Sequence, residues 1–289
     1  MNPYLKILRP DEAFLMSMPV AVIAIVGHDF PIAVFLCILL VFLMAGAGNV
    51  INDVFDYKID AVNKPDRPIP SGRITLKNAR IYAGILYIIS ALISLIISYL
   101  INNFLFFVII MCSAVIIYAY SRYFKAMPLV GNIVTGGMIG FCFVVGGFIL
   151  LCHTKNREIF MVSVYIGIIG AVANVARELV KDMEDVQGDQ LGGARTFPVL
   201  YGKKASSIIT ILLLTVTVAV IIYLYTLGIF NIAYIIITMI AVILCAYCIY
   251  ALVASKLEPV EATCTQMIKL LKIAMAVSML AMITGSFNF

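Results

Sequence analysis

Long apolar runs separated by short polar stretches dominate the chain. A transmembrane helix needs about 20 mainly apolar residues. Nine segments approach this length; they cover residues 11–27, 31–52, 78–100, 103–120, 129–152, 159–176, 205–227, 231–254 and 267–287. Only the first is marginal, because Asp11 and Glu12 open it. Since backbone inside a bilayer must satisfy its own hydrogen bonds, the pattern predicts an all-α integral membrane protein with nine transmembrane helices.

Composition agrees with this prediction. Of the 289 residues, 63% are hydrophobic and 12% are charged. In soluble domains, about half of the residues are apolar and about a quarter are charged. No linker interrupts the spans, so we expect one domain over residues 1–289, and no cleavable signal peptide is evident. The seven cysteines lie mostly in apolar segments and are interpreted as small core residues. Cys245 and Cys248 have CxxC spacing, but no second pair completes a zinc site.

The distribution of basic residues predicts the orientation in the membrane. The net charge is +5 with 20 Lys and Arg, which by itself would also suit nucleic-acid binding. With the N-terminus in the cytoplasm, all of these basic residues except Lys155 and Arg157 fall on the cytoplasmic side. The positive-inside rule therefore predicts a cytoplasmic N-terminus, an external C-terminus after nine spans and a polar site on the inner side.

The first of two acidic motifs follows the second apolar run. It contains Asn49, Asn52, Asp53, Asp56 and Asp60. On a helix, residues four apart lie one above another, so Asn52, Asp56 and Asp60 form a stripe beside Asn49 and Asp53. Like charges at this spacing destabilise a helix, and a counter-ion is therefore required.

The second acidic motif follows the sixth apolar run and contains Asp182, Asp185 and Asp189. The last two are four residues apart, and we expect this helix end to present one carboxylate face as well. Oxygen ligands suit Mg²⁺, which takes a few carboxylates and shares its remaining coordination with substrate phosphates. Two such motifs on one membrane face favour a magnesium site over solvated loop charges.

Basic side chains near these motifs are candidate phosphate ligands. They are Lys64, Arg67, Arg122, Lys125, Arg177 and Lys181.

At these residues the chain resembles the UbiA family of intramembrane prenyltransferases. The resemblance covers nearly the whole length. It rests on Asn52-xxx-Asp56-xxx-Asp60, the following Arg67-Pro-x-Pro-Ser-Gly72, the Tyr118–Lys125 segment and Asp185-xxx-Asp189. The second motif, leading into Gly193-Ala-Arg-Thr-Phe-Pro198, looks most like the archaeal digeranylgeranylglyceryl phosphate synthases. Many members with aromatic acceptors have Tyr-Pro where this chain has Tyr118-Ala119, which speaks against a quinone-type acceptor.

The resemblance implies a helical bundle around a central cavity that opens to the cytoplasm, with loops 53–77 and 177–204 capping the active site. It implies that Mg²⁺ ions bind Asn49, Asn52, Asp53, Asp56, Asp60, Asp182, Asp185 and Asp189. The catalytic residues are expected to be Asp56, Asp60, Asp185 and Asp189. Phosphate oxygens are expected to meet Lys64, Arg67, Tyr118, Ser121, Arg122, Lys125, Arg177 and Lys181.

The reaction implied is transfer of a geranylgeranyl group from its diphosphate to geranylgeranylglyceryl phosphate, which forms the second ether bond of archaeal membrane lipids. The partners are then a prenyl diphosphate, a lipid-soluble acceptor and membrane lipids, without nucleic acid or an obligate protein partner. Two alternatives stay open: prenylation of a 4-hydroxybenzoate or naphthoate acceptor, and cation transport. A CDP-alcohol phosphatidyltransferase is disfavoured because its Asp-Gly-x-x-Ala-Arg motif is absent.

Overall fold

The structure is a computed structural model that describes residues 2–287, without the side chains of residues 62 and 63. The predicted domain bounds 1–289 include residues 1, 288 and 289, which lie outside the described residues. The described chain folds into helices only. They are α1 (Pro3–Leu8), α2 (Pro10–Val26), α3 (Ile32–Asn63), α4 (Leu76–Leu100), α5 (Leu105–Ala119), the π-helical η1 (Tyr120–Phe124), α6 (Val130–Thr154), α7 (Arg157–Glu184), α8 (Val186–Leu191), α9 (Phe197–Thr226), α10 (Ile232–Ala254) and α11 (Glu261–Gly285).

Eight helical segments in the described range are long and apolar enough to cross a membrane. They match eight of the nine predicted spans, so the chain is a multi-pass membrane protein. The ninth predicted span corresponds to α2, which has 17 residues with Pro19 inside it. This length falls below the usual requirement of about 20 residues.

The surface of α4 has the polarity expected of a helix in contact with lipid. Its exposed side includes Ile88 and Leu92, while Ser90 and Ser94 face the protein interior. Each buried serine hydroxyl donates to a carbonyl of its own helix, Leu86 and Ala91 respectively. In water a helix would present polar side chains on its exposed side, so the exposed large apolar side chains fit a helix in a bilayer.

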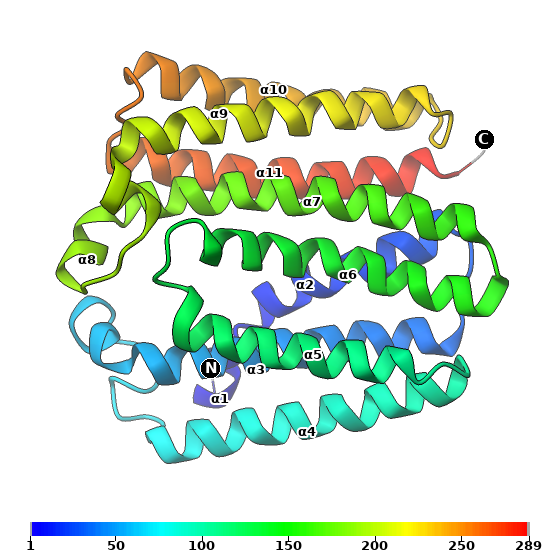
Figure 1. Ribbon diagram of the computed structural model, residues 1–289, viewed down its shortest axis with the longest axis horizontal. Coiled ribbons are helices and arrows are strands. Elements are labelled where there is room, and N and C mark those ends of the chain that lie inside the picture. Colours follow the sequence, from blue (N-terminus) through cyan, green and yellow to red (C-terminus); the bar gives the residue numbers. More distant parts are fainter. Residues whose placement is uncertain (1, 288–289) are drawn as a thin grey trace. The chain divides into compact units, whose positions relative to one another are not determined.

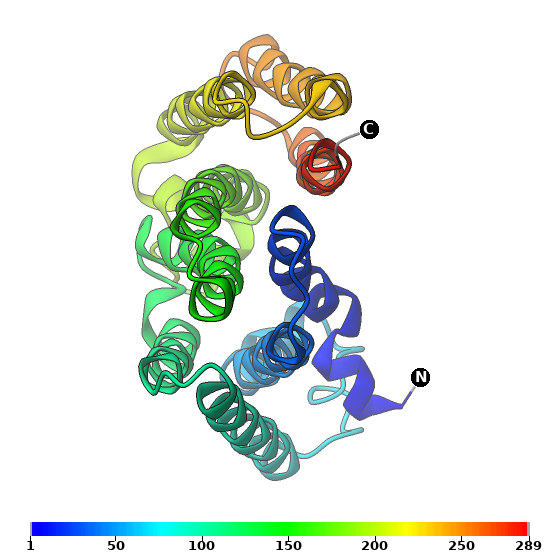
Figure 2. The same cartoon turned by 90° about the vertical axis from the view of Figure 1, so that its right-hand side faces the viewer.

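The chain divides into two compact units. One comprises the chain up to Lys125 together with Cys142–Ser163, and the other comprises Ala126–Phe141 and the chain from Val164 onward. Within the first unit α3 packs against α2 and α4, and α4 packs against α5 (Figure 1). Within the second, α10 packs against α9 and α11, as the end-on view of Figure 2 shows.

Several helices continue beyond the apolar runs that predicted them. Residues 53–63 belong to α3 and residues 177–184 to α7, so only parts of the expected loops 53–77 and 177–204 lie between helices. The expected loop after the fourth span is likewise π-helical over Tyr120–Phe124. Hydropathy locates the membrane boundary, whereas the backbone hydrogen-bond ladder continues into the polar region wherever the sequence allows it.

Candidate active site

The first acidic cluster, defined as Asn49, Asn52, Asp53, Asp56 and Asp60, lies along the last turns of α3. The predicted stripe is present, because the Asn52 amide donates to Asp56 Oδ2 over 3.0 Å. Asp53 and Asp60 are buried, with side chains only 4% and 8% exposed. Buried carboxylates require partners, and the structure provides them.

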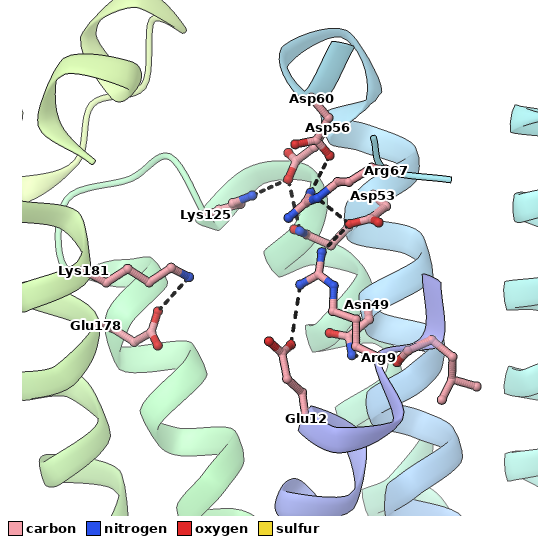
Figure 3. A network of polar contacts seen from close by, with 12 residues as sticks. Arg9, Glu12, Asn49, Asp53, Asp56, Asp60, Arg67, Lys125, Glu178 and Lys181 are labelled. Carbon is pink, nitrogen blue, oxygen red and sulfur yellow. Dashed lines mark hydrogen bonds and ion pairs between the residues drawn. The ribbon is translucent and has the colours of Figure 1, made fainter. Parts of the chain in front are cut away.

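Three cationic side chains neutralise this cluster (Figure 3). Arg9 Nη2 lies 2.5 Å from Asp53 Oδ1, and Arg67 Nη1 lies 3.2 Å from the same oxygen. Arg67 also pairs with Asp60, and Lys125 pairs with Asp56. Each of the three carboxylates therefore contacts at least one basic side chain, which offsets the repulsion between them.

Arg9 reaches Asp53 from the break between α1 and α2. Its backbone has φ 53°, in the left-handed region, where the chain turns from one helix into the next. The Asn49 amide donates to the Leu8 carbonyl over 3.0 Å, and a side chain added at Gly46 would collide with Leu8. Close packing of α1 on α3 thus brings Arg9 to the acids.

Arg67 lies in the short connection between α3 and α4. This connection is a series of turns, in which the Ser71 amide donates to the Arg67 carbonyl and the Ile74 amide to the Pro68 carbonyl, both over 3.0 Å. The turns return Arg67 to the end of α3. Lys64, the other predicted phosphate ligand here, is an exposed residue at the C-cap of α3.

The predicted phosphate ligands of the fourth span lie beside the same cluster. The Arg122 guanidinium stacks on the Phe55 ring at 5.3 Å, and the Tyr118 ring meets Phe55 edge-on at 5.6 Å. Arg122 and Tyr118 are exposed, which leaves both available to a ligand. Ser121 is buried, and its hydroxyl donates to the Ile117 carbonyl over 3.1 Å.

The second acidic cluster, defined as Asp182, Asp185 and Asp189, does not lie on one continuous helix as expected. Asp182 is on α7, Asp185 stands between α7 and α8, and Asp189 is on α8. The amide of Asn132 on α6 donates to Asp182 Oδ2 over 2.7 Å. Thr196 donates to Asp189 Oδ2 over 2.9 Å, and Asp185 is exposed.

The two predicted phosphate ligands on α7 converge on one acid. Arg177 Nη1 lies 2.6 Å from Glu178, and Lys181 Nζ lies 3.7 Å from the other Glu178 oxygen. Figure 3 shows the Lys181–Glu178 pair. Arg177 also donates to Asn174 over 3.5 Å. Glu178 therefore orients both cations, a role that the sequence did not reveal.

The oxygen atoms of the first acidic cluster suit a hard divalent cation. Asn52 Oδ1 is buried and has no hydrogen-bond partner among the described residues, so this amide oxygen is free beside Asp56. No group of three His, Cys, Asp or Glu side chains within the described residues forms a ready metal cage. Mg²⁺ does not need one, because it keeps several waters and binds through one or two carboxylates plus phosphate. The residues fit Mg²⁺ bound together with a phosphate ligand.

Arg9, Asn132 and Glu178 were missed as site residues. Arg9 and Asn132 contact acids 44 and 50 positions away, and nothing in their local sequence indicates this. The seven cysteines are all free thiols, five of them buried, in agreement with the prediction.

Comparison with known proteins agrees with the motifs. The sequence model of the UbiA prenyltransferase family matches residues 13–273. A digeranylgeranylglyceryl phosphate synthase of Methanobrevibacter smithii is 40% identical over 289 residues, which covers 100% of this chain and 99% of the relative. The synthase of Methanothermobacter thermautotrophicus is 35% identical over 286 residues, with 99% and 96% covered.

Solved structures give the same result. One from work on digeranylgeranylglyceryl phosphate synthase in membranes matches with a TM-score of 0.78 and 33% identity, over 98% of this chain and 97% of the other. A UbiA homologue from Archaeoglobus fulgidus bound to GPP and Mg²⁺ has a TM-score of 0.68 over 97% and 99% of the two chains. Its identity is 16%, so this likeness concerns the fold alone.

Proposed function

The chain belongs to the UbiA prenyltransferase family, and from this we propose that it transfers a geranylgeranyl group from geranylgeranyl diphosphate to geranylgeranylglyceryl phosphate. Relatives that bear the name of this synthase align with the chain over nearly its whole length. The structural observation that carries the proposal is the first acidic cluster, where three carboxylates and three cations meet at the end of an apolar helix.

In the reaction, the bond between the allylic carbon and the diphosphate oxygen breaks, and the diphosphate leaves with the electron pair. The acceptor hydroxyl oxygen then bonds to that carbon and loses its proton. When bound, Mg²⁺ neutralises the negative charge that develops on the leaving diphosphate.

The protein's own cations assist by exchanging partners. Arg67 and Lys125 now neutralise Asp60 and Asp56. With Asp56 and Asp60 holding Mg²⁺, both cations would be released to bind the phosphate oxygens. Arg122 and Lys64 contribute further positive charge from exposed positions. Guanidinium groups suit this role because their planar donors match two phosphate oxygens at once.

The second acidic cluster serves the same substrate in this proposal. Asp182, Asp185 and Asp189 provide further oxygen ligands, while Arg177 and Lys181 on the same helix provide charge for a phosphate of the donor or of the acceptor. Expelling water from the apolar surroundings of the prenyl chain protects the carbocation from hydrolysis.

The proposal includes a membrane topology. The helices enclose a cavity open to the cytoplasm, capped by residues 53–77 and 177–204, and α2 crosses as a ninth span. The N-terminus is then cytoplasmic and the C-terminus external. Single cysteines introduced at residues 66 and 156, in a variant without the seven native cysteines, are labelled from either side of sealed vesicles to test this orientation. Residue 66 should be labelled only from the cytoplasmic side.

A product assay tests the activity. The purified protein receives geranylgeranyl diphosphate and Mg²⁺ with either geranylgeranylglyceryl phosphate or 4-hydroxybenzoate, and mass spectrometry identifies the alkylated acceptor. We expect the glyceryl ether alone to be alkylated, and activity to vanish with EDTA and return with Mg²⁺. Alkylation of the aromatic acid instead would refute the proposed acceptor.

Substitutions test the two acidic clusters. Asp56→Ala and Asp185→Ala should each reduce turnover to background while the melting temperature stays near that of the wild type. Asp66→Ala is the matched control, because Asp66 is an exposed acid that accepts hydrogen bonds from Lys6 and Arg73 through its backbone oxygen. Near-normal transfer by either cluster variant would remove that residue from the site.

A further inference from the structure

Asn132 is a buried amide that contacts the second acidic cluster from another helix. Its side chain is on α6, and the residue is 5% exposed. The Nδ2 atom donates to Asp182 Oδ2 over 2.7 Å. Nothing in the family motifs of the sequence pointed to this residue, and the reaction described above does not use it.

Close packing of α6 on α7 determines where this amide lies. Asn132, Gly136 and Gly140 follow one another at intervals of four on α6, so they share one face. A Cβ atom at Gly136 would lie 2.6 Å from the Ala171 carbonyl oxygen of α7, and one at Gly140 would collide with the Gly167 carbonyl oxygen. Only glycine permits this approach, as is common where membrane helices touch.

The two contacts fix the register of α6 along α7. Both glycines face a carbonyl oxygen of the α7 backbone, which cannot turn aside as a flexible side chain can, so neither helix can slide without opening the contact. Asn132 lies one turn beyond Gly136 on the same face, and α6 and α7 run side by side (Figure 1). The position of its amide relative to Asp182 is therefore imposed by the packing of the two helices.

The chemistry of the contact is also specific. An asparagine amide donates a hydrogen bond without carrying charge, so it can orient Asp182 without placing a positive charge beside the carboxyl group. The nearby cations of α7 are paired elsewhere, since Arg177 and Lys181 both contact Glu178. A neutral donor suits a metal ligand, because outer hydrogen bonds orient ligands and raise metal affinity, and it does not compete with the metal's positive charge.

We propose that Asn132, held in register by Gly136 and Gly140, is a positioning residue that orients Asp182 toward the divalent metal of the prenyl diphosphate site. The inference rests on the proposed function, in which Asp182 is a metal ligand. It adds a second helix and a neutral hydrogen-bond donor to that site.

The experiment measures metal binding directly. Mn²⁺ replaces Mg²⁺, and electron paramagnetic resonance reports free Mn²⁺ in the presence of a thio-analogue of geranylgeranyl diphosphate that does not ionise. The wild type is compared with Asn132→Ala, Asn132→Ser and Asp182→Ala, and each melting temperature is recorded. Loss of an outer partner typically weakens metal affinity by about 10- to 100-fold.

We expect Asn132→Ala to weaken Mn²⁺ binding at least about tenfold and to raise the Mg²⁺ concentration for half-maximal turnover in parallel. Asn132→Ser keeps a donor and should recover part of the loss. Gly136→Ala should reproduce the Asn132→Ala defect with the asparagine still present. Gly137→Ala is the matched control on the next residue, because a Cβ there meets nothing within 4 Å.

Wild-type Mn²⁺ affinity in Asn132→Ala would overturn the inference, whether or not the melting temperature falls. A lower melting temperature with unchanged affinity would make Asn132 merely structural. If Gly136→Ala does not fold, the Asn132 variants alone decide. The product assay on the wild type separately tests the proposed function, so failure of that function and failure of this inference give different results.

Discussion

Removing Arg9 should destabilise the protein through a single buried contact. Arg9 is one of two guanidinium partners of Asp53 Oδ1, at 2.5 Å, while Arg67 is the other at 3.2 Å. Arg9→Ala leaves Asp53 buried with Arg67 alone. Arg9→Gly removes the same contact but also relieves the left-handed backbone at φ 53°. The two variants therefore separate the ion pair from the backbone strain.

The expected magnitude follows from these contacts. A hydrogen bond to a charged group contributes about 1.5–3 kcal/mol. The larger cost of about 3–5 kcal/mol for an orphaned buried charge does not apply, because Arg67 remains. The half-exposed contact with Glu12 at 3.5 Å adds little, since such pairs contribute about 0–1 kcal/mol. We expect a loss of about 2 kcal/mol for Arg9→Ala and about 1 kcal/mol less for Arg9→Gly.

Thermal unfolding followed with a thiol-reactive dye provides the assay. The chain has no Trp, but five of its seven cysteines are buried and become reactive on unfolding. Cys37 and Cys142 belong to the same compact unit as Arg9. At roughly 2–4 °C per kcal/mol for somewhat smaller domains, the melting temperature should fall by about 6 °C for Arg9→Ala and about 3 °C for Arg9→Gly.

A matched background makes the test specific. In an Asp53→Asn protein the carboxylate is gone, so Arg9→Ala should lower the melting temperature by no more than about 2 °C. An equal loss in both backgrounds would show that Arg9 does not act through Asp53. Wild-type stability of Arg9→Ala, or lower stability of Arg9→Gly than of Arg9→Ala, would contradict the reasoning as well.

Two further expectations follow from the structure. Arg122→Ala should raise the KM for the prenyl diphosphate by about tenfold, because a charged hydrogen bond is worth about 1.5–3 kcal/mol. The melting temperature should not change, because the exposed guanidinium of Arg122 lies over the rings of Phe55 and Tyr123. Arg122→Lys should restore only part of the KM, and an unchanged KM would exclude a phosphate role. Replacing Cys245 and Cys248 together by Ala should leave prenyl transfer and its dependence on Mg²⁺ intact, because both are buried thiols on α10. A loss of the Mg²⁺ dependence in this double variant would contradict the expectation.

Contacts within one stretch of chain were predictable from the sequence. The helical period places Asn52 against Asp56, and the placement of Arg67 directly after the first acidic motif puts a cation close to Asp60, although the ion pair itself was not predicted. Both placements depend on residues that are close in sequence, so spacing is enough to predict them. The membrane spans were predictable for the same reason, because each is a local run of apolar residues.

Contacts between distant segments were not predictable. Arg9 reaches Asp53 only because α1 packs on α3, and its left-handed backbone occurs at a residue that seldom adopts it. The break at Asp185 was also missed. Neither side of that position carries a proline, and the spacing of Asp182, Asp185 and Asp189 suits a continuous helix equally well. Tertiary packing, which the hydrophobic pattern does not encode, decides both features.

The carboxyl groups of the two acidic clusters have different partners, and this affects the order in which the metal and the diphosphate bind. In the first, Arg9, Arg67 and Lys125 already offset three carboxylates, so a metal arriving alone would add unbalanced positive charge. A metal that arrives with the diphosphate brings its own counter-charge, and the released cations can then bind phosphate. At Asp182 the partner is the neutral Asn132, so a divalent ion can bind this carboxyl without displacing that partner, before any substrate is present. Coulombic attraction in a poorly solvated site is strong enough for this difference to matter, so the second cluster is the one expected to bind metal first.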